Sequence, residues 1–154
     1  MSKVAAIPPG MHTVTPELTL KNCSEALAFY AKAFGAVETS RAPDPSGQKI
    51  FHASFKMGDS TLYCSDEFPE LGILARPARF WIYGESVDAR FQRAVEAGAQ
   101  AAMAPTDAFW GDRFGIVIDP FGHQWTLAQR IQELSPAEMK AAGDAFFAQM
   151  GQQR

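Results

Sequence analysis

Apolar and polar residues alternate along two short stretches of the chain. In "FHASF", Phe51, Ala53 and Phe55 alternate with His52 and Ser54, and "HQWTLA" alternates in a similar way further on. Successive side chains of a strand point to opposite faces, so each stretch predicts a strand with one buried face. His52 and Ser54 would then share the more polar face of the first of these strands.

Helix-end signals predict two helices in the body of the chain. The first has Asn22 as its N-cap, with Glu25 three residues later, and ends at Gly35. The second begins near Ser86 and ends at Gly98.

A third helix is predicted in the C-terminal tail. Ser135 and Glu138 form a capping box with Pro136 at the first helical position, so a helix should span about 136–150 and end at Gly151. Its apolar residues recur at helical spacing, and we expect them to pack on the body of the protein or on a second subunit.

The predicted elements repeat 63 residues apart (98 − 35). "AFYAKAFGA" and "RFQRAVEAGA" both end in Gly-Ala at this offset, and "ELTL" at 17–20 falls on "FWIY" at 80–83. "IFHASFKMGDSTLYCSD" likewise falls on "RFGIVIDPFGHQWTLAQ", which places Gly115 opposite His52. A constant offset predicts two copies of one unit, each a strand, a helix and three further strands.

The fold class expected is therefore α+β, with a flexible lead at 1–12, a first β-α-β-β-β unit at 13–66, a second at 78–130 and a helical tail at 131–154. "MGDS" and "DPFG" are hairpin turns in this scheme. The strands are expected at 14–20, 36–42, 49–57 and 60–65 in the first unit, and at 78–84, 100–104, 113–119 and 123–130 in the second.

Composition excludes several classes of function. The net charge of −3 and the pI near 5.6 argue against a nucleic-acid partner, which would need a basic surface. Two cysteines, Cys23 and Cys64, are too few for a disulfide framework and form no C-x-x-C pair. No run is long enough to span a membrane and no signal peptide is legible, so we expect a cytoplasmic protein.

The motif series "EALAFYAKAFGA", "FHASFKMGDSTLYCSDE", "AVEAGA", "WGDRFGIVIDPFGHQWTLA" and "SPAEM" resembles the vicinal oxygen chelate superfamily, and within it the PhnB-like branch. That superfamily includes glyoxalase I, bleomycin-resistance proteins and extradiol dioxygenases. The resemblance covers roughly residues 13–141. It implies two curled mixed sheets around a shared cleft, a small-molecule ligand and a homodimer.

The resemblance also implies where a metal would bind, and the residue types there are unsuitable. The family's ligand positions fall at Thr15, Tyr63, Ala78–Phe80 with Arg79 among them, and Thr126. None of these is an ordinary ligand of a divalent metal, and an arginine opposes a cation. No cofactor is expected, although an unusual site built from Glu17, His52 and one further group stays conceivable.

The loop Trp110-Gly111-Asp112-Arg113 has no good counterpart in the first unit and supports two hypotheses. Asp112 and Arg113 bond the loop to itself, or Arg113 holds an anionic ligand group while Trp110 stacks on it. Arg79 and Trp81 make a second pair of this kind.

Two functional classes remain, and a purely structural protein is disfavoured because the fold exists around a cleft. The first is a metal-free binding protein with Tyr63, Trp81 and Trp110 as stacking surfaces. The second is a lyase or isomerase with His52 as acid/base and Arg79 or Arg113 at a developing oxyanion. The residues expected at the ligand are His52, Glu17, Tyr63, Arg79, Trp81, Trp110, Asp112, Arg113 and Thr126.

Overall fold

The computed structural model describes residues 4–153. The chain forms two compact units, and the boundary between them in the sequence lies between Ala78 and Arg79. Within the described residues, no helix is both long enough and apolar enough to cross a membrane.

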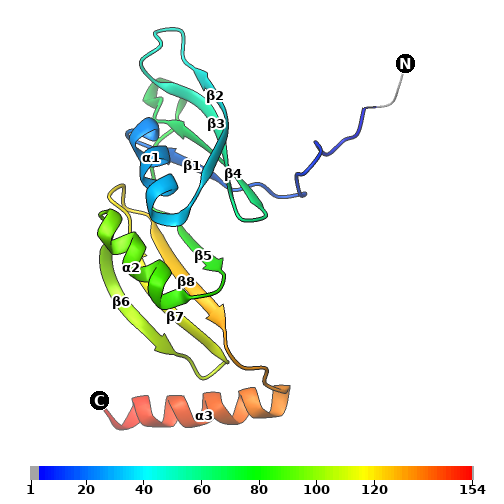
Figure 1. Cartoon of the computed structure of the whole chain (residues 1–154), viewed down its shortest axis with the longest axis vertical. Coiled ribbons are helices and arrows are strands. Elements are labelled where there is room, and N and C mark those ends of the chain that lie inside the picture. The colour runs from blue at the N-terminus through cyan, green and yellow to red at the C-terminus, as the bar shows by residue number, and fades with distance from the viewer. Residues whose placement is uncertain (1–3, 154) are drawn as a thin grey trace. The chain divides into compact units, whose positions relative to one another are not determined.

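The first unit is a four-stranded sheet with one helix (Figure 1). The sheet has the order β1-β4-β3-β2, in which β1 is parallel to β4 and the other neighbours are antiparallel. A short 3-10 turn at Pro69–Leu71 follows the sheet. Its elements are β1 (Glu17–Leu20), α1 (Cys23–Phe34), β2 (Val37–Pro43), β3 (Ile50–Met57) and β4 (Ser60–Asp66).

The second unit repeats this topology, with the strand order β5-β8-β7-β6 and one parallel pair, β5 with β8. The repetition confirms the α+β fold with two tandem units. Its elements are β5 (Arg79–Tyr83), α2 (Val87–Ala97), β6 (Gln100–Asp107), β7 (Asp112–Ile118), β8 (Gln124–Arg130) and the added C-terminal helix α3 (Pro136–Gln152).

The predicted offset of 63 is wrong by one residue in the first strand of each unit. Leu18 pairs with Cys64, and Ile82 pairs with Leu127. If β4 and β8 are aligned 63 residues apart, so that their buried residues coincide, β1 and β5 are offset by 64 (82 − 18). The cause is the helix, which has 12 residues in the first unit and 11 in the second, whereas the spacing from Leu18 to Cys23 equals that from Ile82 to Val87.

The offset is also wrong in the third strand. Phe55 pairs with Leu62, whereas Val117 pairs with Trp125, so the hairpin of the second unit is one residue longer. His52 is therefore equivalent to Phe114 and not to Gly115. A shift of one residue exchanges the two faces of a strand, so the correction changes which side chains share a surface.

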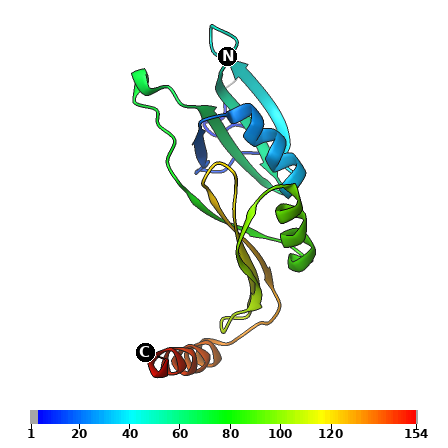
Figure 2. The same ribbon diagram turned by 90° about the vertical axis from the view of Figure 1, so that its left-hand side faces the viewer.

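One face of each sheet is buried beneath its own helix. In the first unit, Tyr30 of α1 stacks on Phe55 of β3 with ring centroids 5.7 Å apart. The sulfurs of Cys23 and Cys64 lie 3.1 Å apart in the same core, and the hydrogen bond to Cys64, together with burial, raises the pKa of Cys23. Figure 2 shows α1 lying along its sheet.

In the second unit, Trp125 is buried and stacks on Phe80 with centroids 4.7 Å apart. Gly115 is required beneath α2, because a Cβ there would lie 2.9 Å from the ring of Phe91 and 3.1 Å from Pro105.

Most of the helix ends follow the sequence signals. The Asn22 side chain accepts a hydrogen bond from the backbone of Glu25, and Gly35 ends α1 in the left-handed region. Ser135 and Glu138 form the reciprocal capping box of α3. The prediction for Gly151 is wrong: α3 continues through it to Gln152, because glycine in a last helical turn weakens a helix without ending it.

A buried carboxylate fixes the β7–β8 hairpin. Asp119 Oδ1 accepts hydrogen bonds from the backbone N–H groups of Phe121 and His123, both at 2.9 Å, and Oδ2 accepts one from Trp125 Nε1 at 2.9 Å. Gly122 completes the turn with a φ of 91°, which confirms the predicted "DPFG" turn. His123 directly precedes β8 and is buried.

α3 contacts the rest of the second unit through one loop residue. The ring of Phe109 lies 5.1 Å from that of Phe146, and a Cβ at Gly143 would approach Phe109 to 3.3 Å. No strand or other helix of the part of the chain that the structure describes packs against α3. The helix therefore keeps apolar side chains such as Phe147 and Met150 exposed.

We predict that Asp119→Ala lowers the free energy of unfolding by about 3 kcal/mol, because it leaves buried donors without an acceptor. Urea denaturation measures the loss. Asp59→Ala is the matched control in the equivalent turn of the first unit, where the carboxylate bonds only the exposed Ser60 hydroxyl. An equal loss in both variants would contradict the role given to Asp119.

We predict that the protein loses stability as the pH falls through 6.5. Burial lowers the pKa of His123 below its usual value of 6.5, although the nearby Asp119 opposes the shift. Below pH 6.5 the unfolded chain binds a proton that the folded chain does not, so the free energy of unfolding falls, by up to about 1.4 kcal/mol per pH unit, until the folded pKa is reached. His123→Gln should flatten this slope, and His12→Gln at an exposed position should not. An unchanged slope in His123→Gln would contradict the assignment.

Candidate functional site

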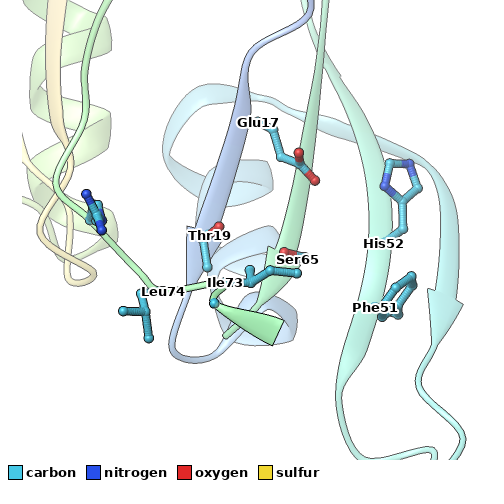
Figure 3. Close-up of a pocket in the computed structure, with 9 residues that line it drawn as sticks. Glu17, Thr19, Phe51, His52, Ser65, Ile73 and Leu74 are labelled. Carbon is cyan, nitrogen blue, oxygen red and sulfur yellow. The ribbon is translucent and has the colours of Figure 1, made fainter. Parts of the chain in front are cut away.

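A cavity of about 510 Å³ lies in the first unit, on the sheet face that α1 does not cover. This volume falls within the range of small-molecule sites. Its walls come from three strands and from the segment that follows the 3-10 turn, as Figure 3 shows. The chemically useful lining residues are Glu17, Thr19, Phe51, His52, Ser65 and Arg76.

His52 is half-buried at this cavity and meets Tyr63 edge-on, with ring centroids 4.6 Å apart. Glu17 is the direct partner of Tyr63 in the parallel register, so it stands on the same face. Figure 3 shows the Glu17 carboxylate pointing toward the strand that carries His52. The structure thus brings together Glu17, His52 and Tyr63, three of the residues predicted from the sequence.

The cavity is lined by one carboxylate, Glu17, one guanidinium, Arg76, and the imidazole of His52. Such a lining can bind a polar organic molecule and can exchange a proton with it. Neither Arg76 nor Ser65 was predicted from the sequence. Arg76 lies in an irregular segment that carries no periodic signal.

Asp66 holds these strands in position from the buried side. Its Oδ1 accepts a hydrogen bond from the backbone N–H of Cys23 at 2.8 Å, and its Oδ2 accepts one from Ile50 at 2.7 Å. Ile50 is two residues before His52, and Ser65 is next to Asp66 in the chain. One carboxylate therefore ties the start of α1 to β3 and β4, two of the three strands that line the cavity.

The second unit exposes a different surface on the sheet face opposite α2. Its aromatic face consists of Trp81 and Tyr83 on β5, Phe114 on β7, and Trp110 in the loop before β7. Trp81 is 5.6 Å from Phe114 and 6.4 Å from Trp110 between ring centroids. Thr126, which pairs with Trp81 in the register, is buried beneath these rings.

Asp112 organises the aromatic face. Its Oδ2 accepts hydrogen bonds from the hydroxyl of Tyr83 and from Nε1 of Trp110, both at 2.8 Å. The bond from Tyr83, together with burial, raises the pKa of that phenol above its usual value. The first hypothesis for this loop holds for Asp112, which does bond the loop to itself. Tyr83 and Phe114 were missed, although Tyr83 is two residues from Trp81 and so shares its face.

Arg113 lies on the opposite side of β7 from this face. Its guanidinium bonds both oxygens of Asp88 on α2, at 2.8 Å each, and Asp107 on β6 at 2.9 Å. These carboxylates raise the pKa of Arg113, and the same pairing lowers the pKa of Asp88. The structure therefore does not bring Arg113 together with Trp110, because adjacent strand residues point to opposite faces.

Arg79 stands on the same side of β5 as Trp81 and Tyr83, and it is exposed. It is the one residue predicted for an oxyanion role that shares a face with the predicted stacking residues.

The residues at the family's metal positions do not form a suitable donor set. Thr15, Tyr63, Arg79 and Thr126 offer two hydroxyls, a phenol and a cation, where a catalytic metal needs about three imidazole, carboxylate or thiolate ligands. Within residues 4–153, no three side chains of the histidine, cysteine, aspartate or glutamate types gather as they would around a metal ion. Glu17 and His52 alone do not complete such a set.

Comparisons with known proteins support this fold. An uncharacterized protein of Mycobacterium bovis is 38% identical over 138 residues, which cover 84% of this chain and 90% of that protein. Protein YjdN of Escherichia coli is 26% identical over 127 residues, which cover 69% of this chain and 86% of that protein.

Solved structures with lower identity share the architecture. TioX from Micromonospora has a TM-score of 0.66 at 22% identity, over 78% of this chain and 99% of its own. A gene product of Arabidopsis thaliana has a TM-score of 0.62 at 23% identity, over 77% of this chain and 98% of its own.

The family model of the Glyoxalase/Bleomycin resistance protein/Dioxygenase superfamily matches residues 11–127. This match spans both four-stranded units from β1 into β8. With the duplicated topology, it shows that the chain belongs to the glyoxalase/bleomycin resistance protein/dioxygenase superfamily.

Proposed function

We propose that this protein binds a small organic molecule on the open sheet faces and does so without the superfamily's metal site. The cavity of about 510 Å³ at Glu17, His52 and Ser65 carries the proposal. Polar groups from three strands converge there, as they do in small-molecule sites.

The chemistry of the donor set supports the metal-free part of the proposal. A threonine, a tyrosine and an arginine at the inherited positions hold organic ligands by hydrogen bonds and charge. They do not replace the imidazole and carboxylate ligands of a divalent metal. We place the protein in the PhnB-like branch on its sequence motifs, and we propose a cytoplasmic homodimer, as the superfamily resemblance implies.

A second candidate is an enzyme that moves a proton, of the lyase or isomerase type. Its support is the placement of His52 at the cavity, edge-on to Tyr63 and on the face that carries Glu17. In this case His52 takes or gives the proton. Glu17 or Arg76 would orient the polar group of the substrate.

We predict that Thr19→Phe blocks ligand binding, because the new ring occupies the half-buried wall of the cavity. Amide chemical shifts in a small-molecule screen report binding through residues 17–19, 52 and 63–65. Lys56→Phe is the matched control, since it adds the same ring to the same sheet at an exposed position outside the cavity. Ligands that bind Thr19→Phe as well as the native protein would contradict the site.

We predict that chelator treatment leaves this binding unchanged. Elemental analysis before and after EDTA, followed by the same titration, measures it. A stoichiometric divalent metal whose removal weakens binding more than tenfold would overturn the metal-free assignment.

We predict different effects of His52→Ala under the two candidate functions. In an enzyme, the variant loses turnover by about 100-fold or more while ligand binding persists. In a binding protein, only affinity changes. Glu17→Gln, which removes a charge without changing size, should alter binding under both candidates.

A further inference from the structure

The aromatic face of the second unit is a single continuous layer of rings. Trp81 and Tyr83 are stacked with centroids 6.0 Å apart, and Trp110 and Phe114 are 5.3 Å apart. These two pairs are joined by Trp81 and Phe114, whose ring centroids are 5.6 Å apart. Trp81 and Tyr83 remain 47% and 59% exposed, so the layer is available to a ligand.

The polar edges of two of these rings are already satisfied from inside. The phenol of Tyr83 and the indole N–H of Trp110 both donate to Asp112, which is only 6% exposed. The hydrogen bonds hold both rings by their edges. They also leave the ring faces, which carry the negative side of the aromatic quadrupole, for the ligand.

The charges around this layer favour a cation. The carboxylate of Asp112 lies directly behind Tyr83 and Trp110. Arg130 is its neighbour in the β7–β8 register, but the guanidinium of Arg130 pairs with Glu133 at 3.5 Å.

Arg113 adds no positive charge to the layer, because it points to the other side of the sheet and is matched by Asp88 and Asp107. Arg79 begins the same face, two residues before Trp81 and four before Tyr83, which is roughly 7 and 13 Å along the strand. The end of the layer at Tyr83 and Trp110 is therefore the negative end.

We propose that this layer recognises an organic cation, either an aromatic ring with a delocalised positive charge or a quaternary nitrogen, seated on Trp81 and Tyr83 above Asp112. The inference rests on the proposed function and names the ligand class. Ring faces attract cations by cation–π interaction, and a flat cation also gains stacking area on Trp81. A compact ammonium ion, which is strongly hydrated, should bind more weakly than either type.

The test compares two probes of similar shape and different charge. N-methylquinolinium chloride is a permanent flat cation, and 4-methylquinoline is its neutral partner at mildly alkaline pH. Isothermal titration calorimetry against the full-length chain, with sodium chloride as the salt control, gives both affinities. We expect the cation to bind about tenfold more tightly than the neutral partner.

Three variants distinguish the contribution of the negative charge to binding from the contribution of the aromatic ring. Asp112→Asn keeps an acceptor for Tyr83 and Trp110 while it removes the negative charge, so it should weaken the cation severalfold and leave the neutral probe unchanged. Trp81→Leu keeps an apolar side chain at a half-exposed position and removes the ring, so it should weaken both probes. Asp59→Asn removes an exposed carboxylate in the other unit and should change neither.

The outcomes distinguish this inference from the function on which it rests. Equal affinity for both probes, each lost in Trp81→Leu, overturns the preference for a cation and leaves small-molecule binding intact. No binding of either probe overturns the layer as a ligand surface, while ligands that bind at the cavity of the first unit would still support the proposed function. Preference for the cation that survives Asp112→Asn overturns the role of the carboxylate and, with it, the inference as stated.

Discussion

In the part of the chain that the structure describes, one helix packs against each sheet, and the rest of the structure depends on that constraint. A four-stranded sheet has two faces, and a strand sends alternate side chains to each of them. α1 and α2 each bury one face, where Tyr30 meets Phe55 and Trp125 meets Phe80. The remaining face of each unit is the one on which we propose that a ligand binds, and its residues are those between the buried ones.

Buried carboxylates then set the geometry of these exposed faces. Asp66 joins the start of α1 to β3, Asp119 holds the β7–β8 hairpin, and Asp112 holds Tyr83 and Trp110 by their polar edges. Each accepts at least two hydrogen bonds in a poorly solvated position, where an unsatisfied donor is costly. The site residues are side chains on a frame that these acids fix.

The two units have kept one topology and diverged in chemistry on the open face. The first offers Glu17, His52, Ser65 and a neighbouring Arg76, a polar lining suited to hydrogen bonds and proton exchange. The second offers Trp81, Tyr83, Trp110 and Phe114, a lining suited to stacking.

The sequence by itself determined the elements and their order. Local signals such as the Asn22 cap, the "DPFG" turn and the Ser135 capping box act over a few residues, so they are readable without tertiary information. The repeat of these signals at about 63 residues was enough to predict two tandem units, and the motif series carried the resemblance to the superfamily. The chemistry at Thr15, Tyr63, Arg79 and Thr126 was likewise legible, because residue type alone decides whether a side chain is a suitable ligand.

Only the tertiary structure decided which side chains meet. A helix shorter by one residue in the second unit, and a hairpin longer by one, moved β5 and β7 by one residue each, and such a step exchanges the faces of a strand. It therefore placed Phe114 where the repeat had suggested Gly115. It also took the structure to show that Arg113 faces Asp88 and Asp107 while Asp112 faces Tyr83. Strand register is set by pairing between distant segments, and hydrogen bonds across 25 or 29 residues leave no local pattern in the sequence.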